Sequence, residues 1–274
     1  MTRLDPDVIR DSLDESVAGR LAAFEAFKEI ASTNSYLMDR EAPSPGQFHV
    51  ALTDNQVAGR GRHGRVWQSP AGSGLALSLA YTFAAQPSNL AALTLAIGVG
   101  AIEALDSVGI GGVQLKWPND LVADDGKLGG ILTETQTQPD NAIKVVTGLG
   151  LNIELEPEIA SKLGSAGTGR VVDLTVIADA LPCRNRLAAQ LIACLGATFV
   201  GYESSGFAAY AGRWAQCDWL RGRELTVDTA QDRVTGFGAG IAGDGALLVR
   251  TPSGEVRKVS SGTIVMTGGL GDSG

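Results

Sequence analysis

The longest uncharged segment of the chain, residues 66–102, places the strongest constraint on its fold. A stretch without a single Asp, Glu, Lys or Arg has to be buried, either in a protein core or in a membrane. Turn-forming residues at Pro70, Gly72, Pro87 and Asn89 divide it, so no piece reaches the roughly 20 apolar residues that a membrane span needs. We therefore expect a soluble domain that carries this segment in its core.

Hydrophobic periodicity predicts secondary structure along most of the chain. Apolar side chains alternate with small ones over residues 75–83, which predicts a strand, and residues 90–108 are typical of a buried helix. Asp5 followed by Pro6 predicts a helix start within residues 1–20. The other expected elements are strands at 22–30, 48–53, 113–117 and 143–153, a hairpin over 121–134, a helix from Tyr36 and helices over 182–217.

The sequence changes character after Asp218, where short alternating apolar runs are divided by Gly and Asp turns. This pattern predicts a small β-barrel of about 55 residues, near the lower limit for independent folding. We predict an α+β domain over residues 1–217, with a mixed or antiparallel sheet and flanking helices. A β-barrel domain over residues 218–274 follows it.

Charge and cysteine content exclude several classes of function. The chain has 22 Lys+Arg and 30 Asp+Glu, a net charge of -8, which disfavours binding to DNA or to an anionic membrane. Its odd number of cysteines, without a CxxC pair, fits reduced thiols in a cytoplasm, and the simplest place for Cys183, Cys194 and Cys217 is the core. Two histidines, His49 and His63, are too few for a zinc cluster. The charged N-terminus is not a signal peptide.

The most informative motif is the alternation of glycine and arginine over residues 59–65. Glycine lets the backbone approach a ligand, and arginine presents a fork that matches carboxylate and phosphate oxygens. We interpret the segment as a mobile anion clamp rather than as a solvated loop. It also matches GxGxxG, but Pro70 prevents the helix that a dinucleotide fold requires, and no acidic residue occurs between this segment and Glu103.

A second motif, Lys116-Trp117-Pro118-Asn119-Asp120, ends a predicted strand. Proline restricts the backbone, so the polar pair Asn119 and Asp120 would project from a defined corner beside a cation and an aromatic ring. An ordinary strand-end turn explains the same residues equally well.

Glycines inside apolar strand segments form a third pattern, at Gly129, Gly130, Gly148 and Gly150. They indicate that the backbone comes close to something flat, although hairpin geometry accounts for the neighbouring Gly126. Gly126-Lys127 is not a Walker motif, because the upstream glycine spacing and the following Ser or Thr are missing. Ser32-Thr33-Asn34 is typical of a helix N-cap, which is compatible with a ligand contact.

Taken in order, these blocks resemble the biotin protein ligase family. The resemblance rests on Ser32-Thr33-Asn34, on Gln56 with the segment from Gly59 to Trp67, on Lys116-Trp117-Pro118-Asn119-Asp120, on Lys127-Leu128 with Gly130-Ile131-Leu132, and on Gly148 with Gly150 and Asn152. It implies a class II aminoacyl-tRNA-synthetase-like catalytic domain and an SH3-like C-terminal β-barrel. The implied reaction joins biotin and ATP into biotinoyl-AMP and pyrophosphate, then moves the biotinoyl group to a lysine of a biotin carboxyl carrier protein.

The resemblance also implies a role for each matching residue. Biotin would be bound at its ureido end and between apolar walls by Ser32, Thr33, Asn34, Gln56, Gly130, Leu132 and Gly148. Its carboxylate and the new acyl phosphate would be covered by Gly59, Arg60, Gly61, Arg62 and Lys127. ATP and the adenylate would contact Arg62, Arg65, Trp67, Lys116, Asn119, Asp120 and Asn152, with Mg²⁺ carried by ATP rather than by a dedicated protein site.

The chemistry asks for the same residue types. A carboxylate that attacks a phosphate must overcome repulsion between anions. Cations at the junction would therefore stabilise the developing charge, and the candidates are Arg60, Arg62, Lys116 and Lys127. The mixed anhydride is labile in water, so a loop that folds over it would protect it. The acceptor lysine must lose its proton before it attacks, and Asp120 is the candidate that orients or deprotonates it.

Two features depart from the family pattern. Some members carry an N-terminal DNA-binding module, whereas here 31 residues precede Ser32, so we expect a ligase without repressor function, present as a monomer or weak homodimer. Residues 161–174 also lack the Ala-Thr-Ser-Leu run expected after Asn152, so the adenine-side loop should differ in this chain.

Three other interpretations compete with the ligase. A lipoate ligase or octanoyl transferase shares the fold class but lacks the Gly-Arg clamp. A non-catalytic biotin sensor could bind DNA or a partner, and the net charge of -8 argues against DNA. An α+β protein without a ligand does not explain five ordered motifs.

Overall fold

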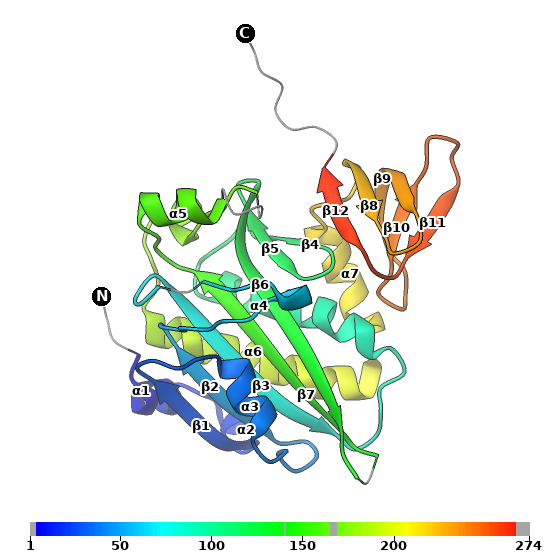
Figure 1. Cartoon of the computed structure of the whole chain (residues 1–274). Helices are drawn as coiled ribbons and strands as arrows, with labels where there is room; N and C mark the ends of the chain where they lie inside the picture. The colour runs from blue at the N-terminus through cyan, green and yellow to red at the C-terminus, as the bar shows by residue number, and fades with distance from the viewer. Residues whose placement is uncertain (1–3, 69, 140, 165–168, 267–274) are drawn as a thin grey trace.

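The computed structural model describes residues 4–68, 70–139, 141–164 and 169–266. A seven-stranded sheet forms the centre of the larger domain, with strand order β1-β2-β3-β7-β6-β5-β4 (Figure 1). Its first pair is parallel and all other neighbours are antiparallel, so the predicted mixed sheet is confirmed. The strands are β1 Leu21–Phe27, β2 Phe48–Thr53, β3 Gly74–Phe83, β4 Gln114–Lys116, β5 Asp120–Ala123, β6 Gly126–Thr137 and β7 Ile143–Asn152.

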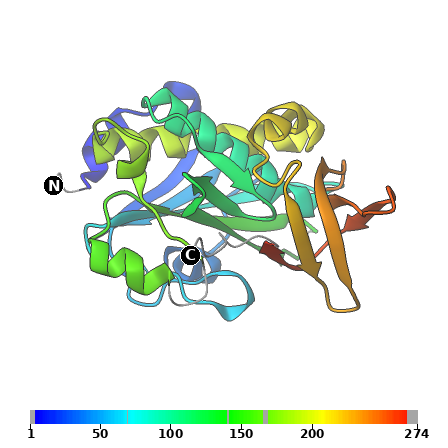
Figure 2. The ribbon, with the colours of Figure 1, turned by 90° about the horizontal axis from the view of Figure 1, so that it is seen from above.

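Residues 74–83 and 93–102 of the uncharged segment form the centre of this domain, as expected, whereas Val66 at its start is 71% exposed. All ten residues of β3 are buried, because β3 lies between β2 and β7 and is covered on both faces. Helices α4 (Leu93–Ser107) and α6 (Arg184–Ser205) pack against each other on one face. Helix α3 (Thr33–Asp39) packs on β2, β3 and β7, and Figure 2 shows the long helices on one side of the sheet with α5 (Pro157–Leu163) on the other.

The N-terminal elements differ in detail from the expectation. Asp5 does cap a helix with Pro6 in its first turn, but the segment forms two short helices, α1 (Pro6–Asp11) and α2 (Glu15–Ala18), because Asp14 caps a second start. The next helix begins three residues earlier than predicted, since Ser32 caps α3 by accepting the backbone N–H of Ser35. Helix α5 was not predicted, and none of its residues is buried, so it has no apolar periodicity to detect.

Two helical segments are long and apolar enough to cross a membrane by length and composition alone. They are Leu90–Ser107 and Arg184–Ser205, and 67% and 56% of their apolar windows are buried inside the molecule. Most of this surface is therefore already covered by the sheet and by the partner helix, as in the core helices of globular domains.

Helix α7 (Ala208–Cys217) leads into the C-terminal domain, a five-stranded antiparallel sheet of order β11-β10-β9-β8-β12. Its strands are β8 Glu224–Asp228, β9 Arg233–Ile241, β10 Leu247–Arg250, β11 Val256–Val259 and β12 Thr263–Met266. The indole N–H of Trp117 donates to the carbonyl of Gly245 at 2.9 Å, and Gly245, at a φ of +87°, lies against Ala92. The two domains are therefore joined close to the Lys116–Asp120 motif.

The cysteines are only partly where the sequence placed them. Cys217 is buried and Cys194 half-buried, but Cys183 is exposed, so its prediction as a core thiol is wrong. Cys183 lies at the start of α6 rather than inside its apolar face.

Candidate active site

A single cavity of about 460 Å³ brings the predicted segments together. This volume falls in the range of small-molecule sites, roughly 300 to 1,000 Å³. All the residues predicted for the site except Gly59 line it: Ser32, Thr33, Asn34, Gln56, Arg60, Gly61, Arg62, Arg65, Trp67, Lys116, Asn119, Asp120, Lys127, Gly130, Leu132, Gly148 and Asn152. Gly59 lines a smaller neighbouring cavity and accepts a hydrogen bond from the backbone N–H of Trp67 at 2.9 Å.

Buried polar side chains form one end of the cavity, at the start of α3. The carboxamide oxygen of Gln56 accepts from the backbone N–H of Thr33 at 2.9 Å. The hydroxyls of Thr33 and Ser78 lie 2.7 Å apart, and Ser78 donates to Asn34 Oδ1 at 2.7 Å. Ser32, Thr33, Asn34 and Ser78 are each at most 4% exposed. Buried polar groups that satisfy one another hold their positions rigidly, so this end presents a fixed hydrogen-bonding surface.

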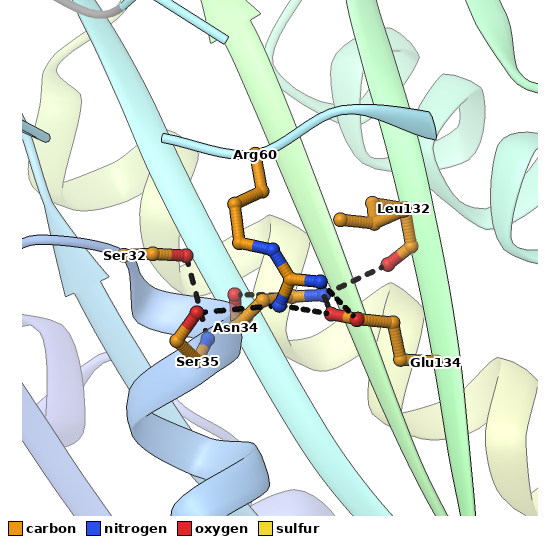
Figure 3. A network of polar contacts seen from close by, with 7 residues as sticks. Ser32, Asn34, Ser35, Arg60, Leu132 and Glu134 are labelled. Carbon is orange, nitrogen blue, oxygen red and sulfur yellow. Dashed lines mark hydrogen bonds and ion pairs between the residues drawn. The ribbon is translucent and has the colours of Figure 1, made fainter. Parts of the chain in front are cut away.

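Asn34 connects this polar end to the Gly-Arg loop, the segment of alternating glycine and arginine at residues 59–65 (Figure 3). Its Nδ2 donates to the carbonyl of Leu132 at 3.2 Å and to Glu134 Oε2 at 3.1 Å. Glu134 in turn forms an ion pair of 2.7 Å with Arg60, and Arg60 also donates to the Ser35 hydroxyl at 3.3 Å. The Arg60 guanidinium therefore lies beside the start of α3, with its charge already paired.

The Gly-Arg loop folds back on itself across the cavity. The backbone N–H of Gly61 donates to the carbonyl of Arg65 at 2.7 Å, and Arg60 and Val66 form an isolated β-bridge. His63, with a φ of +55°, and Gly64, with a φ of +72°, make the turn at the tip. The Arg62 side chain points to the other end of the cavity, where it donates to Asn119 Oδ1 at 3.4 Å. Burial lowers the pKa of Arg62, and the nearby carboxylate of Asp120 opposes that shift.

Trp67 is the flat group that two of the four strand glycines approach, whereas a Cβ on Gly129 would lie 2.7 Å from the backbone carbonyl oxygen of Gly150. A Cβ on Gly150 would lie 2.3 Å from the indole ring, and one on Gly130 would lie 3.5 Å from it. The same reasoning applies to Gly148, where a Cβ would lie 2.2 Å from Asn34 Oδ1. Two of these glycines are thus required by side chains of the site itself.

Two lysines and an aspartate form the other end of the cavity. Lys127 Nζ lies 2.8 Å from Asp120 Oδ1, and 5.9 Å from the centroid of the Trp67 ring. Burial lowers the pKa of Lys116, Asp120 opposes the shift, and Lys127 adds to it. Asn119 Nδ2 donates to the carbonyl of Ile131 at 2.8 Å, which fixes the turn between β4 and β5.

The segment after β7 lies beside Lys127. Val171 forms a parallel β-bridge with Lys127, and Asn152, 5% exposed, donates to the carbonyl of Val172 at 2.9 Å. Asn152 therefore holds this segment against the site. Residues 165–168, part of the stretch expected to differ from the family, lie outside the described residues.

Sequence reasoning missed several lining residues. Ser78 was a detectable signal, because a polar residue interrupts the apolar strand 75–83 on the face that carries Ala76 and Ala80. Glu134, which does not itself line the cavity but forms the ion pair with Arg60, had no such signal in a strand end rich in Thr and Gln. Gly262, Thr263 and Ile264 of the C-terminal domain also line the cavity, which no local pattern indicates.

Within the described residues, no three His, Cys, Asp or Glu side chains gather to hold a metal ion.

Comparison with protein families gives two matches. Residues 26–152 match the biotin/lipoate A/B protein ligase family, and residues 222–266 match the biotin protein ligase C terminal domain. The first match spans the cavity motifs from Ser32 to Asn152, and the second spans the small antiparallel sheet.

Individual relatives cover most of the chain. The bifunctional ligase/repressor BirA of Salmonella typhimurium is 35% identical over 247 residues, which are 90% of this chain and 73% of the relative. The biotin--[acetyl-CoA-carboxylase] ligase of Paracoccus denitrificans is 31% identical over 258 residues, 88% of this chain and all of the relative. The structure of the biotin protein ligase of Aquifex aeolicus in complex with biotin and ATP aligns with a TM-score of 0.73 at 25% identity, over 90% of this chain and 100% of the other.

Proposed function

This chain belongs to the biotin protein ligase family, and from that membership we propose how its cavity carries out the reaction. The enzyme activates biotin with ATP to biotinoyl-5′-AMP and transfers biotin to a lysine of a biotin carboxyl carrier protein. The residue assignments below rest on one observation: Arg62, Lys116 and Lys127, from three separate segments, line the same cavity as the polar start of α3.

Biotin would lie with its ureido ring at the start of α3. The ring offers two N–H donors and one carbonyl acceptor, which match the hydroxyls of Ser32 and Thr33 and the amides of Asn34 and Gln56. Gly130, Leu132 and Gly148 would form the walls beside its apolar chain. Because the buried polar groups are already held by mutual hydrogen bonds, little ordering is needed on binding.

The biotin carboxylate would then reach the end of the cavity that holds Lys127. One carboxylate oxygen attacks the α-phosphorus of ATP, the bond from that phosphorus to the β-phosphate bridging oxygen breaks, and pyrophosphate leaves. Arg62 and Lys127 would stabilise the negative charge that gathers at the α-phosphate. Lys116, already partly desolvated, would contact the phosphates from the other side.

ATP would be held by the remaining predicted residues, Arg65, Trp67, Asn119 and Asn152. The Trp67 indole offers a flat apolar surface for the adenine base. Asn152 would act indirectly, through the segment at Val172 that it anchors. Mg²⁺ bound to ATP would supply charge neutralisation at the departing pyrophosphate.

In the second half-reaction the amine of the carrier lysine attacks the acyl carbon. The bond from that carbon to the phosphate oxygen breaks, AMP leaves, and the amine nitrogen loses a proton. In this structure Asp120 is paired with Lys127. An incoming biotin carboxylate would compete for Lys127, which frees one oxygen of Asp120 to orient the amine or accept its proton.

The Gly-Arg loop would cover the adenylate. Gly59, Gly61 and Arg62 would lie over the carboxylate and the acyl phosphate, whereas Arg60 would fasten the loop through Glu134. A covered mixed anhydride is protected from water until the carrier arrives.

The organisation of the enzyme is also part of this proposal. We assign residues 1–217 to catalysis and residues 218–274 to the small C-terminal domain. We further propose cytoplasmic action as a monomer or weak homodimer without DNA binding, supported by the net charge of -8 and by three cysteines that are all free.

The decisive test is incubation with labelled biotin and ATP, with and without a biotin carrier domain. We expect biotin-dependent exchange of pyrophosphate into ATP without the carrier, and labelled carrier when it is added. Calorimetry with biotin and with lipoate distinguishes the ligase from a lipoate enzyme. Absence of biotin-dependent exchange would contradict the proposed function.

A further inference from the structure

Trp219 lies in the linker between α7 and the first strand of the C-terminal domain, and it contacts the strand that carries Lys116. Its backbone N–H donates to the carbonyl of Leu115 at 3.0 Å, and the preceding Asp218 forms a parallel β-bridge with Leu115. The Trp219 side chain is 7% exposed, so its indole is packed rather than free. The linker thereby extends the edge of the seven-stranded sheet at β4.

The indole of Trp219 also contacts Lys116 itself. Lys116 Nζ lies 5.1 Å from the ring centroid, within the distance of a cation–π interaction. Within the described part of the chain, no carboxylate lies within ion-pair distance of Lys116. An aromatic face holds an ammonium group without neutralising it, so the charge of Lys116 stays available for a phosphate.

The Trp219 ring is also held by a residue of the β5–β6 hairpin. The indole N–H donates to Asp125 Oδ1 at 2.8 Å, and Arg223, whose guanidinium lies 4.3 Å from the ring centroid, donates to the same oxygen at 2.8 Å. Asp125 is two residues before Lys127. Trp219 therefore connects the strand that carries Lys116 with the hairpin that leads to Lys127.

We propose that Trp219 is a positioning residue for ATP use, which holds Lys116 toward the phosphates and links the C-terminal domain to the first half-reaction. The proposal rests on the function assigned above, because it needs Lys116 to contact ATP. It also gives the domain boundary a role, because Asp218 and Trp219, the first residues after α7, contact the strand and the side chain of Lys116.

The test compares Trp219→Leu, which removes the ring, with Trp219→Phe, which keeps an aromatic face but loses the bond to Asp125. The readout is biotin-dependent pyrophosphate exchange, with KM measured for ATP and for biotin. We expect Trp219→Leu to lower kcat/KM for ATP by roughly 3- to 30-fold, the range of a partly buried cation–π contact, while KM for biotin stays within about twofold. Trp219→Phe should recover most of the loss.

Two further measurements separate positioning from general packing. In a Lys116→Met background, Trp219→Leu should cause no additional loss, since its effect passes through the ammonium group. Trp214→Leu is the matched control, because Trp214 is 3% exposed and lies in α7 before the same linker. It should lower the melting temperature without a selective effect on ATP.

Each other outcome overturns the inference. Equal losses for ATP and biotin, an unrescued Trp219→Phe enzyme, or a Trp219→Leu effect that persists in the Lys116→Met background would show a purely structural role. If the wild-type enzyme lacks biotin-dependent exchange, the proposed function fails first. An active wild type with an unaffected Trp219→Leu variant leaves that function intact and removes only the role of Trp219.

Discussion

Lys127 Nζ and Asp120 Oδ1 lie 2.8 Å apart at the end of the cavity where Arg62 and Lys116 also converge. The two side chains are about equally half-buried, 23% and 24% exposed, so the pair is neither a surface contact nor a sealed core interaction. Opposite charges in that setting favour each other, and an anionic substrate can exchange with the carboxylate at modest cost. Each member of the pair thus lies where one proposed half-reaction needs it, Lys127 for adenylate formation and Asp120 for transfer to the carrier lysine.

Replacing Asp120 with Asn should separate the two half-reactions. Pyrophosphate exchange should stay within a few-fold, because Lys127 keeps its charge for the biotin carboxylate. Transfer to saturating carrier should fall by about 10²-fold or more, the usual contribution of a general base. Asp124→Asn, on the same hairpin but in an exposed pair with Arg170, is the matched control and should retain both activities. Normal transfer by Asp120→Asn would exclude the proposed role.

Replacing Lys127 with Ala should abolish most adenylate formation. The loss of one preorganised cation at the developing charge predicts a decrease of about 10²- to 10³-fold in the exchange rate. Circular dichroism should show an intact fold, since the lysine is near the surface of the cavity. Lys258→Ala, which removes an exposed ion pair with Asp244, controls for the loss of a positive charge and should have little effect. Near-normal exchange by the Lys127 variant would contradict its assignment.

The ion pair between Arg60 and Glu134 should control how firmly the Gly-Arg loop stays closed. Glu134→Gln and Arg60→Met should each speed release of bound biotinoyl-AMP by about 2- to 5-fold, since partly exposed ion pairs contribute up to about 1 kcal/mol. The double variant should be no worse than either single one, because both remove the same contact. Arg233→Met, in an exposed pair with Asp228, serves as control. Unchanged release rates would show that the pair does not fasten the loop.

Adding one methyl group at Gly150 should displace Trp67. A Cβ there would lie 2.3 Å from the indole, closer than any real contact, so the ring must move in Gly150→Ala. We expect KM for ATP to rise by at least about tenfold, in line with a misplaced binding group. Gly111→Ala is the control, because a Cβ at Gly111 meets nothing within 4 Å. Wild-type ATP kinetics in Gly150→Ala would mean that the Trp67 position is unimportant.

His49 on β2 should make the fold sensitive to acid. Its pKa is lowered mainly by burial and further by Arg40 and Lys144, while Glu25 opposes the shift. Its Nδ1 has no hydrogen-bond partner among the residues that the structure describes. The unfolded state therefore binds a proton more readily than the folded state, so the free energy of unfolding should fall as the pH drops through about 6.5. Urea titrations at pH 7.5 and pH 5.5 measure this decrease, which should be smaller in His49→Gln. An equal decrease in both proteins would exclude His49 as its source.

The motifs of the site could be found in the sequence because each consists of residues that are close together in the chain. Alternating Gly and Arg, Trp117 followed by Pro118 and Asn119, and Ser32 as a helix cap are each contiguous in sequence, so residue type and short spacing were enough to single them out. The strand alternation that placed Leu75 to Phe83 in the core is likewise local, because side-chain direction repeats every two residues.

The contacts between those motifs could not be found in the same way. Glu134 meets Arg60 because β6 is registered against β7 so that its side chain faces the start of α3, 100 residues from Asn34 in sequence. The expectation for Arg60, drawn from its position in the loop, missed this ion pair for the same reason. Trp219 reaches Lys116 only because the linker runs along the edge strand β4.

The amino-acid sequence alone determined the fold class, the family motifs and the set of charged and polar residues available for chemistry, since these depend on residue type and short spacing. Tertiary structure decided which cation is paired with which carboxylate, which glycine accommodates Trp67, and that the C-terminal domain reaches the cavity. Those relationships depend on strand register and domain packing, through which residues more than 50 positions apart come within a few ångströms of one another.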